Sequence, residues 1–355
     1  MTPVSSDCTQ AFGHTDFDLG RLDARYPSIC PVSGCESRPT DVGFGKRTFP
    51  VCLTHGIQLR QSQTFVYWNG AGEERRARLR NFPIQPGLAA AIALESKAKA
   101  ETHRLGYEMS EDALTWNVFV GLAKAGALRA ATRFLAGTDP GSEPRLYLWG
   151  ERIDLSGKAP ERFEPLDAVR KKLEKGISRF LTEPDIILVV DGRTLVCVEA
   201  KFGSGNPLAH AAKTAEDEKP QDRSGLIQRY LRPASKKTRI AINEQSIGSG
   251  LHGQLFRNLV FASEMAGQQD WHVVNLVSET QWRDPKDSPT FSYRDPTAEI
   301  GAYLSDEDRQ RFAFRTWEQL YRQVIAPVPE LAAVQDYMQG KSAHFRPAFD
   351  LPPVG

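Results

Sequence analysis

Apolar residues follow helical and strand periodicities in turn along the chain from residue 110 onward. Ser110 is a suitable N-cap, and Leu114, Val118 and Leu122 after it repeat at the spacing of one helix face. Other segments with alternating or continuous apolar runs predict strands at 145–153, twice within 183–201 and at 270–279. Helical spacing predicts helices at 166–181, 224–232, 253–267 and about 305–325. This order of a helix, three strands, helices and a further strand predicts a mixed α/β sheet.

The two apolar runs around Asp191-Gly192 predict a hairpin with charges at one end. Asp-Gly is a strong signal for a tight hairpin turn. A loop of two or three residues places Asp185 opposite position 198 or 199, so Asp185 and Glu199 are expected at the same end of the strand pair. Because side chains alternate along a strand, Glu199 and Lys201 are expected to point to one face.

These three charged residues suggest metal-assisted hydrolysis. Two carboxylates held close on a buried sheet repel each other unless a cation neutralises them, and Mg²⁺ favours carboxylate oxygens while keeping some water ligands. Lys201 could then orient or deprotonate an attacking water next to a phosphate. Glu-X-Lys on an edge strand is common as a solvated pair, and Pro-Asp often starts a strand or turn. Their combination with two apolar strands and a hairpin turn is much rarer.

Pro184-Asp185 followed by Glu199-Ala200-Lys201 resembles the motif of the PD-(D/E)XK (restriction-endonuclease-like) nuclease superfamily. The resemblance implies an αβββαβ core with a mixed sheet and a further acid on the helix before the strands. Glu111 is the first candidate for that acid and Asp112 the second. A glutamine on the helix after the strands is also implied, and Gln228, with Tyr230 close by, is similar to it.

Four of the five cysteines lie before residue 53, and their spacing suggests a metal site. Cys30 and Cys35 have four residues between them, and Cys52 and His55 have two. Three thiolates and one imidazole on two short turns can enclose a tetrahedral Zn²⁺, which resembles a zinc-finger or zinc-ribbon site of no particular family. Reduced cysteines packed in a small core are the alternative. Cys8 or His14 could replace an assigned ligand, whereas Cys197 is expected to pack within the hairpin.

Net charge does not indicate a partner, because 45 Lys and Arg residues balance 44 acidic residues. Local basic clusters could bind a nucleic-acid backbone, or could be ordinary solvated surface. They are Arg75, Arg76, Arg78 and Arg80 near aromatic residues, Arg170, Lys171, Lys172 and Lys175, and Lys236, Lys237 and Arg239. The chain has no run of about 18 apolar residues and no secretory leader pattern, so we expect a cytoplasmic protein without a membrane partner.

The sequence therefore predicts three parts: a zinc-binding, nucleic-acid-binding module at 1–82, a linker or helix at 83–104, and a nuclease domain with a helical C-terminal extension at 105–355. The expected activity is Mg²⁺- or Mn²⁺-dependent hydrolysis of nucleic acid, expected to be DNA, in defence or repair. Asp185, Glu199 and Glu111 would hold the metal, and Zn²⁺ would be structural. A homo-oligomer or an activating protein partner is compatible with this prediction. A nuclease fold that binds nucleic acid without cutting it, and a hydrolase of another phosphate-bearing substrate, are the alternatives.

Overall fold

The computed structural model describes residues 29–44, 46–60, 64–68, 70, 77–78, 80–84, 105–156, 161–177, 181–210, 223–231, 239–248, 250–280, 291–344 and 346–352. The chain divides into two compact units. Unit 1 comprises Met1–Ala125 with Ile325–Gly355, and unit 2 comprises Gly126–Val324. The boundaries predicted at residues 82 and 105 stay predictions, because most of the segment between them lies outside the described residues.

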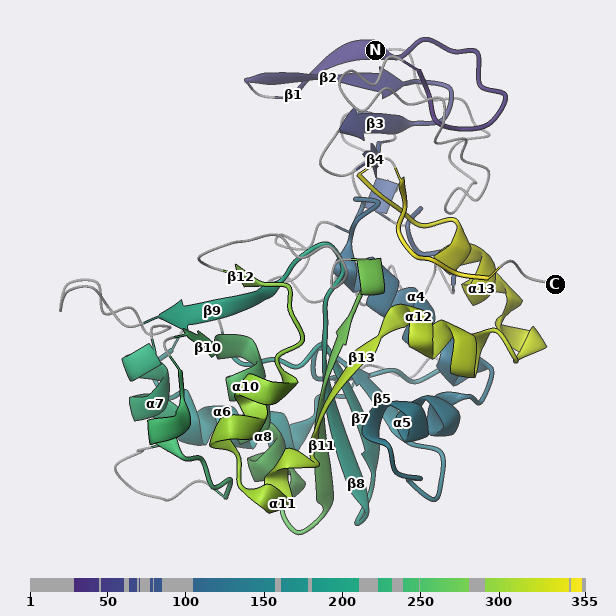
Figure 1. Cartoon of the computed structure of the whole chain (residues 1–355). Helices are drawn as coiled ribbons and strands as arrows, with labels where there is room; N and C mark the ends of the chain where they lie inside the picture. Colours follow the sequence, from purple (N-terminus) through teal and green to yellow (C-terminus); the bar gives the residue numbers. More distant parts are fainter. Residues whose placement is uncertain are drawn as a thin grey trace. The chain divides into compact units, whose positions relative to one another are not determined.

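Unit 2 is built on a six-stranded mixed sheet in the order β13-β11-β8-β7-β5-β6 (Figure 1). The strands are β5 (Arg145–Leu148), β6 (Glu151–Arg152), β7 (Ile186–Val190), β8 (Thr194–Ala200), β11 (Asp270–Val277) and β13 (Phe312–Thr316). β7 runs antiparallel to both β5 and β8, whereas β11 is parallel to both β8 and β13. The carboxyl ends of β8, β11 and β13 and the start of β7 therefore lie at one edge of the sheet. The mixed α/β architecture predicted from the sequence is confirmed.

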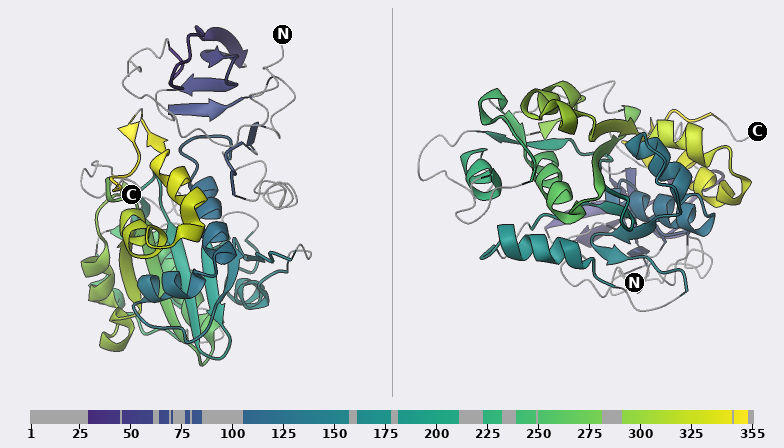
Figure 2. Two further views of the ribbon diagram at one scale, coloured as in Figure 1. Left: turned by 90° about the vertical axis from the view of Figure 1, so that its right-hand side faces the viewer. Right: turned by 90° about the horizontal axis from the view of Figure 1, so that it is seen from below.

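Helices lie on both sides of this sheet (Figures 1 and 2). α8 (Gly253–Ala266) packs on β8 and β11, and its apolar residues form one core with Leu195, Cys197 and Val273. Cys197 is fully buried in that core, as its strand position predicts. α5 (Leu128–Ala136) contacts β11 and β13. The other helices of the unit are α6 (Glu164–Leu173), α7 (Arg223–Leu231), α10 (Thr297–Tyr303), α11 (Asp306–Arg309) and α12 (Trp317–Leu320).

A smaller three-stranded sheet in unit 2 has the order β10-β9-β12. Its strands are β9 (Asn206–His210), β10 (Gly250–His252) and β12 (Phe291–Ser292), all paired antiparallel. β9 follows the end of β8 after five residues and also packs on α8. The small sheet therefore begins where the charged end of the predicted hairpin is found.

Unit 1 combines an antiparallel four-stranded sheet with helices from both ends of the chain. The sheet contains β1 (Thr40–Phe44), β2 (Arg47–Cys52), β3 (Ile57–Arg60) and β4 (Thr64–Tyr67). The helices are α4 (Glu111–Lys124) and α13 (Ala332–Gln339), followed by a β14 (Ser342–Ala343) and β15 (Arg346–Pro347) hairpin. Ser110 caps α4, as predicted, by accepting a bond from the Ala113 N–H at 3.2 Å. α13 packs so closely on α4 that a Cβ at Gly121 would overlap Val334.

Three predicted elements are wrong in extent or type. The predicted strand at 145–153 is the β5–β6 hairpin, which turns at Trp149 and Gly150, both with positive φ. The predicted helix at 166–181 begins at Glu164 and ends at Leu173. The predicted helix at 305–325 contains β13 between α11 and α12, because pairing with β11 extends the main sheet. The expected helical extension therefore includes β13, β14 and β15.

A buried ion pair joins the two sequence segments of unit 1. Lys341 and Glu108 are 2% and 3% exposed, and their charged groups lie 3.1 Å apart. The Ser342 N–H donates to the second Glu108 carboxylate oxygen at 2.8 Å. Glu108 also connects to the four-stranded sheet, since its N–H donates to the carbonyl of Phe65. A buried charge without its partner is costly, so each residue depends on the other.

Replacing Lys341 with Met should lower the free energy of unfolding of unit 1 by about 3–5 kcal/mol, because Glu108 is left buried without a cation. The double variant Glu108→Leu/Lys341→Met should recover much of this loss. Urea unfolding of the three proteins, followed by intrinsic fluorescence, measures the difference. Equal stability of wild type and Lys341→Met would contradict this role of the ion pair.

Candidate functional site

The β7–β8 hairpin has the register that the sequence predicts. The turn includes Asp191 and Gly192, and Gly192 has a φ of 69°, which favours glycine. Ile186 pairs with Val198, so Asp185 lies opposite Glu199 at the open end of the hairpin. The Ala200 N–H donates to the Asp185 Oδ2 at 2.9 Å, which directs this carboxylate toward the end of β8.

Glu199 and Lys201 form a buried ion pair at that end of the hairpin. Glu199 is 3% and Lys201 5% exposed, and the Lys201 Nζ lies 2.5 Å from the Glu199 Oε1. The other carboxylate oxygen of Glu199 accepts a bond from the Asn258 Nδ2 of α8 at 2.8 Å. Both oxygens are therefore held, one by a cation and one by an amide. We call Asp185, Glu199 and Lys201 the hairpin cluster.

Polar side chains of neighbouring elements fix the backbone around Glu199 and Lys201. The Asn275 Nδ2 of β11 lies 3.4 Å from the Glu199 carbonyl oxygen, and its Oδ1 accepts from Asn206 at 2.9 Å. The Trp317 indole N–H donates to the Lys201 carbonyl oxygen at 3.1 Å. These bonds satisfy polar groups in a buried region, where unsatisfied groups would be costly. The end of β8 is consequently held from β9, β11 and α12.

A very small cavity lies against Lys201. Its volume is about 10 Å³, and it is lined by Lys201, Ser204–Asn206, Val277 and Ser292–Arg294. This is close to the minimum space that one water molecule needs. The loop after β8 approaches β12 closely here, since a Cβ at Gly205 would lie 2.7 Å from the Ser292 carbonyl oxygen. Glycine at position 205 therefore permits this tight packing beside the lysine.

The loop before Asp185 is anchored by Arg170 and Glu174. The Arg170 guanidinium donates to the Thr182 carbonyl oxygen at 2.7 and 2.9 Å, and also contacts Glu183. The buried Glu174 carboxylate accepts from the Thr182 N–H at 2.9 Å and from the Tyr230 hydroxyl at 2.7 Å. The sequence suggests Arg170 as a candidate for phosphate contacts. Its side chain is 12% exposed and holds the chain that leads into Asp185 instead.

A second carboxylate pair lies at the same sheet edge, after the ends of β11 and β13. Glu318 is fully buried and accepts from the Glu279 N–H at 2.8 Å, while Glu279 pairs with Arg322 at 3.4 Å. Burial raises the pKa of Glu318 to about 7, although the bond from the Glu279 N–H opposes this shift. Negative charge on Glu279 contributes to the same upward shift. Glu318 therefore titrates near neutral pH.

The remaining predicted catalytic residues are placed as follows. Glu111 and Asp112 are half-buried in the first turn of α4 in unit 1. Because the hairpin cluster belongs to unit 2, the predicted role of either acid beside it stays a prediction. Gln228 lies on α7 with an exposed side chain, and its catalytic role also stays a prediction. Tyr230 is buried and binds Glu174, so it supports the loop before Asp185.

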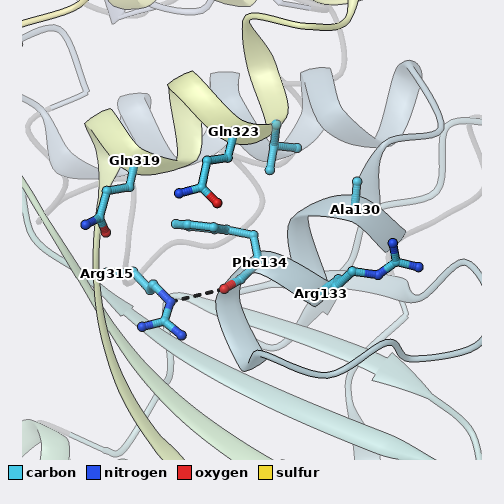
Figure 3. A pocket seen from close by; sticks show the side chains of 7 residues that line it. Ala130, Arg133, Phe134, Arg315, Gln319 and Gln323 are labelled. Carbon is cyan, nitrogen blue, oxygen red and sulfur yellow. Dashed lines mark hydrogen bonds between the residues drawn. The ribbon is translucent and has the colours of Figure 1, made fainter.

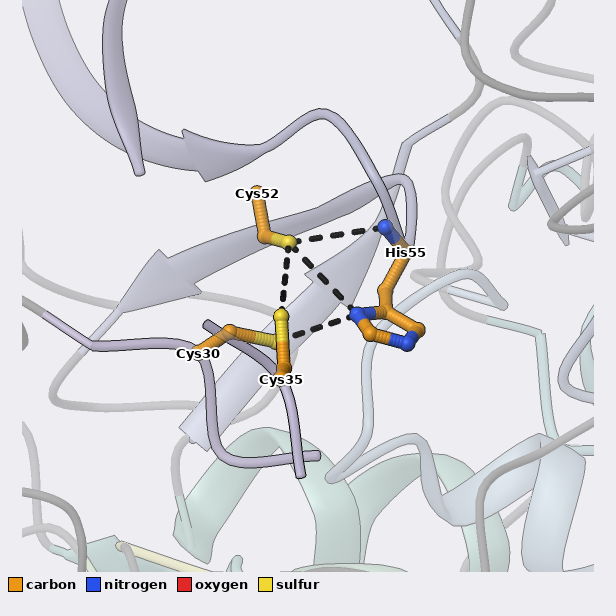
Figure 4. A group of neighbouring side chains, drawn as sticks. All are labelled: Cys30, Cys35, Cys52 and His55. Atoms are coloured by element: carbon orange, nitrogen blue, oxygen red, sulfur yellow. Dashed lines mark hydrogen bonds between the residues drawn. The ribbon is translucent and has the colours of Figure 1, made fainter. Parts of the chain in front are cut away.

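Cys30, Cys35, Cys52 and His55 come together in unit 1 as the sequence predicts (Figure 4). One potential ligand atom from each residue lies within 4.8 Å of all the others. Cys52 ends β2, His55 lies in the turn that leads to β3, and Gly34 between the first two cysteines has a φ of 71°. Two turns therefore bring the four side chains together. Among the described residues, this is the group with at least three Cys, His, Asp or Glu ligands close enough to hold a metal ion.

The spacing within this cluster fits a tetrahedral zinc ion. Zn–S and Zn–N bonds of about 2.3 and 2.0 Å at tetrahedral angles separate the ligand atoms by roughly 3.5–3.8 Å. The Cys35 and Cys52 sulfurs are 3.9 Å apart, and the His55 Nδ1 lies 3.4 and 3.6 Å from the Cys30 and Cys52 sulfurs. A hydrogen bond from Cys30, with a smaller contribution from His55, lowers the pKa of Cys52 to about 5 against the effect of burial, which favours the thiolate that binds metal. The cluster could therefore hold a metal such as zinc.

Arg80 stabilises the turn that carries His55. Its guanidinium donates to the carbonyl oxygens of His55 and Gly56 at 2.7 and 2.8 Å and lies 4.9 Å from the centre of the Tyr67 ring. The sequence suggested Arg80 as a nucleic-acid contact. With 1% of its surface exposed, this residue is structural. Arg78 is half-buried, while Arg75 and Arg76 lie outside the described residues.

The other basic positions considered from sequence are divided between exposed residues and ion pairs. Lys171 and Lys175 are exposed, whereas Lys172 pairs with Glu264 at 2.6 Å. Arg239 contacts the Gly267 carbonyl oxygen. Lys236 and Lys237, like Cys8 and His14, lie outside the described residues.

Sequence reasoning missed Asn258, Asn275, Trp317 and Glu318. The signal for the two asparagines is a polar residue within an apolar run, in "LFRNLVF" and "HVVNLV". Such a residue in a buried element needs a polar partner, although the sequence does not say which one.

Comparisons with models of protein families, with curated proteins and with solved structures find no match for this chain. No helix in the described ranges has the length and apolar character needed to cross a membrane.

Glu318 should make stability depend on pH. Its pKa is raised in the folded state, so the native protein holds more protons than the unfolded chain between about pH 4.5 and 7. The favourable contribution is present below this range and is lost as the pH rises through it. Glu318→Gln should therefore become more stable than wild type above pH 7, by about 3 kcal/mol. Urea unfolding at pH 5 and pH 8 measures this, with exposed Glu307→Gln as the control. Parallel pH profiles for wild type and Glu318→Gln would refute it.

Proposed function

We propose that the protein is a metal-dependent nuclease that hydrolyses phosphodiester bonds, with DNA as its substrate. The observation that carries the proposal is the end of the β7–β8 hairpin, where Asp185 lies opposite Glu199 and Glu199 contacts Lys201. Two carboxylates and a lysine at one sheet edge supply the groups that such a reaction needs: metal ligands and a hydrogen-bond donor for water or phosphate.

The order of elements supports this proposal. The helices α4 and α5 are followed by β5, β7 and β8, and then by α8 and the parallel strand β11. This agrees with the αβββαβ core implied by the resemblance to restriction-endonuclease-like nucleases. β6 and α6 are inserted after the first of these strands, and β9, α7 and β10 are inserted after the third. Fold alone does not establish activity, so the proposal depends on the hairpin cluster.

In the hairpin cluster, the two carboxylates would bind the metal ion, and the lysine would orient a water or a phosphate. Asp185 and Glu199 offer the hard oxygen ligands that fit Mg²⁺ or Mn²⁺, and such an ion, when bound, lowers the pKa of its water ligands and offsets charge on a phosphate. Lys201 has three N–H donors, of which one is directed to Glu199. Its ammonium group borders the adjoining cavity, where it would orient a water or contact a phosphate oxygen. Asn258 holds the Glu199 carboxylate in place by its 2.8 Å bond.

A non-cleaving nucleic-acid-binding protein remains the second candidate because Lys201 is already paired. The ion pair is nearly fully buried, and the cavity beside it holds about 10 Å³. A buried, satisfied ion pair can be a structural feature without catalytic use. The nuclease and the non-cleaving protein can be distinguished by Asp185→Asn, which replaces one carboxylate oxygen of the hairpin cluster. In a nuclease this change abolishes hydrolysis while leaving DNA binding intact.

Asp185→Asn should reduce Mg²⁺-dependent cleavage of DNA at least about 100-fold, because it removes one anionic metal ligand while keeping an acceptor for the Ala200 N–H. Circular double-stranded and single-stranded DNA are incubated with Mg²⁺ or Mn²⁺ and with full-length wild type, Asp185→Asn or Lys201→Ala. Lys124→Ala is the matched control, since this exposed lysine ends α4 and belongs to none of the basic clusters suggested as nucleic-acid contacts. Thermal unfolding checks that each variant is folded.

Loss of cleavage in Asp185→Asn and Lys201→Ala, with Lys124→Ala unchanged, is the result expected of a nuclease. Tight DNA binding without cleavage by folded wild type would favour the non-cleaving alternative. Cleavage that persists in both hairpin variants would place the active site elsewhere and overturn the proposal.

We also propose that the Cys30, Cys35, Cys52 and His55 cluster binds a structural Zn²⁺. Four protein ligands complete a tetrahedral shell and leave no position for a substrate or a reactive water. The bond network of Arg80 around His55 supports this role, because it holds the turn from outside the cluster. Without metal, close thiols and an imidazole give a small module little stability.

The purified full-length protein should contain one zinc ion per chain, and Cys52→Ser should lose most of it and become sensitive to protease within unit 1. Cys197→Ala is the matched control, because Cys197 is also fully buried but lies in β8 among apolar residues. Atomic emission measures the metal, and limited proteolysis with mass spectrometry locates the cleavage. Zinc content that is unchanged in Cys52→Ser would contradict the assignment.

A further inference from the structure

Unit 2 has a cavity on the face of the main sheet that carries α5. Its volume is about 530 Å³, within the range of roughly 300–1,000 Å³ typical of small-molecule sites. It is lined by Ala130, Arg133, Phe134, Arg315, Gln319, Gln323 and Val324, and we call it the α5 cavity (Figure 3). None of these lining residues is acidic, so the cavity is suited to anions and not to metal cations.

The α5 cavity is separate from the hairpin cluster. Arg315 is in register with Leu276 of β11, which pairs in turn with Ala200, whereas Glu199 is in register with Asn275. Since neighbouring residues of a strand point to opposite faces, Arg315 projects from the face opposite to that of Glu199. A ligand in the α5 cavity is therefore held by a different set of groups.

Arg315 supplies a positive charge that no carboxylate balances within the described part of the chain. Its Nε donates to the Phe134 carbonyl oxygen at 3.1 Å and its Nη1 to the Phe314 carbonyl oxygen at 3.0 Å. The Arg315 side chain is half-buried, and this burial lowers the pKa of its guanidinium. Arg133 adds a second cation at the rim, where it shares Asp139 with Arg129. The Glu143 carboxylate lies beside this group and accepts from the backbone N–H groups of Leu128 and Arg129, so the unbalanced charge of the cavity is that of Arg315.

The rest of the lining suits a flat polar ring. The half-buried Phe134 ring offers an aromatic surface, and Gln319 and Gln323 project toward it from α12 and the following π-helix, Tyr321–Ile325 (Figure 3). Gln319 is held by the capping box of α12, in which its Oε1 accepts from the Thr316 N–H at 3.1 Å. Its amide nitrogen is thereby left as a donor. Amides of this kind pair with the edges of nucleobases, and aromatic rings stack on their faces.

We propose that the α5 cavity binds a nucleotide, with its phosphate on Arg315 and Arg133 and its base against Phe134. Inorganic phosphate or a small carboxylate would use the arginines but leave the aromatic ring and most of the volume without a role. An apolar ligand would leave the arginines and glutamines unpaired. A nucleotide can occupy all three kinds of surface, either as a free molecule or as one unit of a single strand. This proposal does not depend on nuclease activity.

Isothermal titration of the full-length protein with adenosine 5′-monophosphate tests this site, because the probe has no phosphodiester bond to cleave. Binding should be weakened about tenfold or more in Arg133→Gln and Arg315→Gln, since each loses a charge-assisted hydrogen bond. Phe134→Leu should weaken binding of the nucleotide more than that of inorganic phosphate. Arg129→Gln is the matched control, because Arg129 also lies on α5 and pairs with Asp139 but does not line the cavity.

Arg133 is exposed, so its replacement tests the site without disturbing the core; thermal unfolding checks the Arg315 variant. No binding of the nucleotide at about 1 mM, or equal binding by Arg133→Gln and wild type, would overturn the proposal. Inorganic phosphate that binds as tightly as the nucleotide would also overturn it. Displacement of the nucleotide by a short single-stranded DNA identifies a strand as the source, and failure of the DNA to compete identifies a free nucleotide.

Discussion

The buried pair of opposite charges at the end of β8 is the constraint around which unit 2 is organised. Glu199 and Lys201 have left water, and the cost of that desolvation is recovered only if each charge keeps its partner and its remaining hydrogen bonds. Asn258 from α8 donates to the Glu199 carboxylate, and Trp317 from α12 donates to the Lys201 backbone carbonyl oxygen. α8, from the middle of the unit's sequence, and α12, near its end, thus meet at one point of the sheet, and this electrostatic need constrains where both helices lie.

Local signals predict the parts of the molecule whose geometry is set by neighbouring residues. The Asp191-Gly192 turn determines the register of β7 and β8, which is why Asp185 could be placed opposite Glu199 from sequence. The Cys and His spacing likewise predicts a cluster formed by two short turns. In both cases, short turns determine which side chains come together.

Distant pairings are not encoded in this way. β13 is a strand because it pairs with the free edge of β11. Its local sequence does not indicate this, because the N-cap at Ser305 shortly before it is a signal for a helix. Asn258 meets Glu199 across 59 positions, and no local pattern indicates that meeting. The α5 cavity is assembled from α5 and from residues about 180 positions later. The sequence therefore predicts the charged groups of the hairpin better than the polar groups that surround them.

The order in which the chain is synthesised bears on the ion pair between Glu108 and Lys341. The two residues are 233 positions apart, with the whole of unit 2 between them. At a ribosomal rate of about 5–20 residues per second, Glu108 waits roughly 10–50 s for its cation. Unit 2 is continuous and can form during this interval, whereas unit 1 can be completed only after its C-terminal segment leaves the ribosome. During translation, therefore, the N-terminal segment of unit 1 is made first but cannot complete its fold until the end. Until then, the Glu108 carboxylate without its cation and the apolar face of α4 would be open to a chaperone.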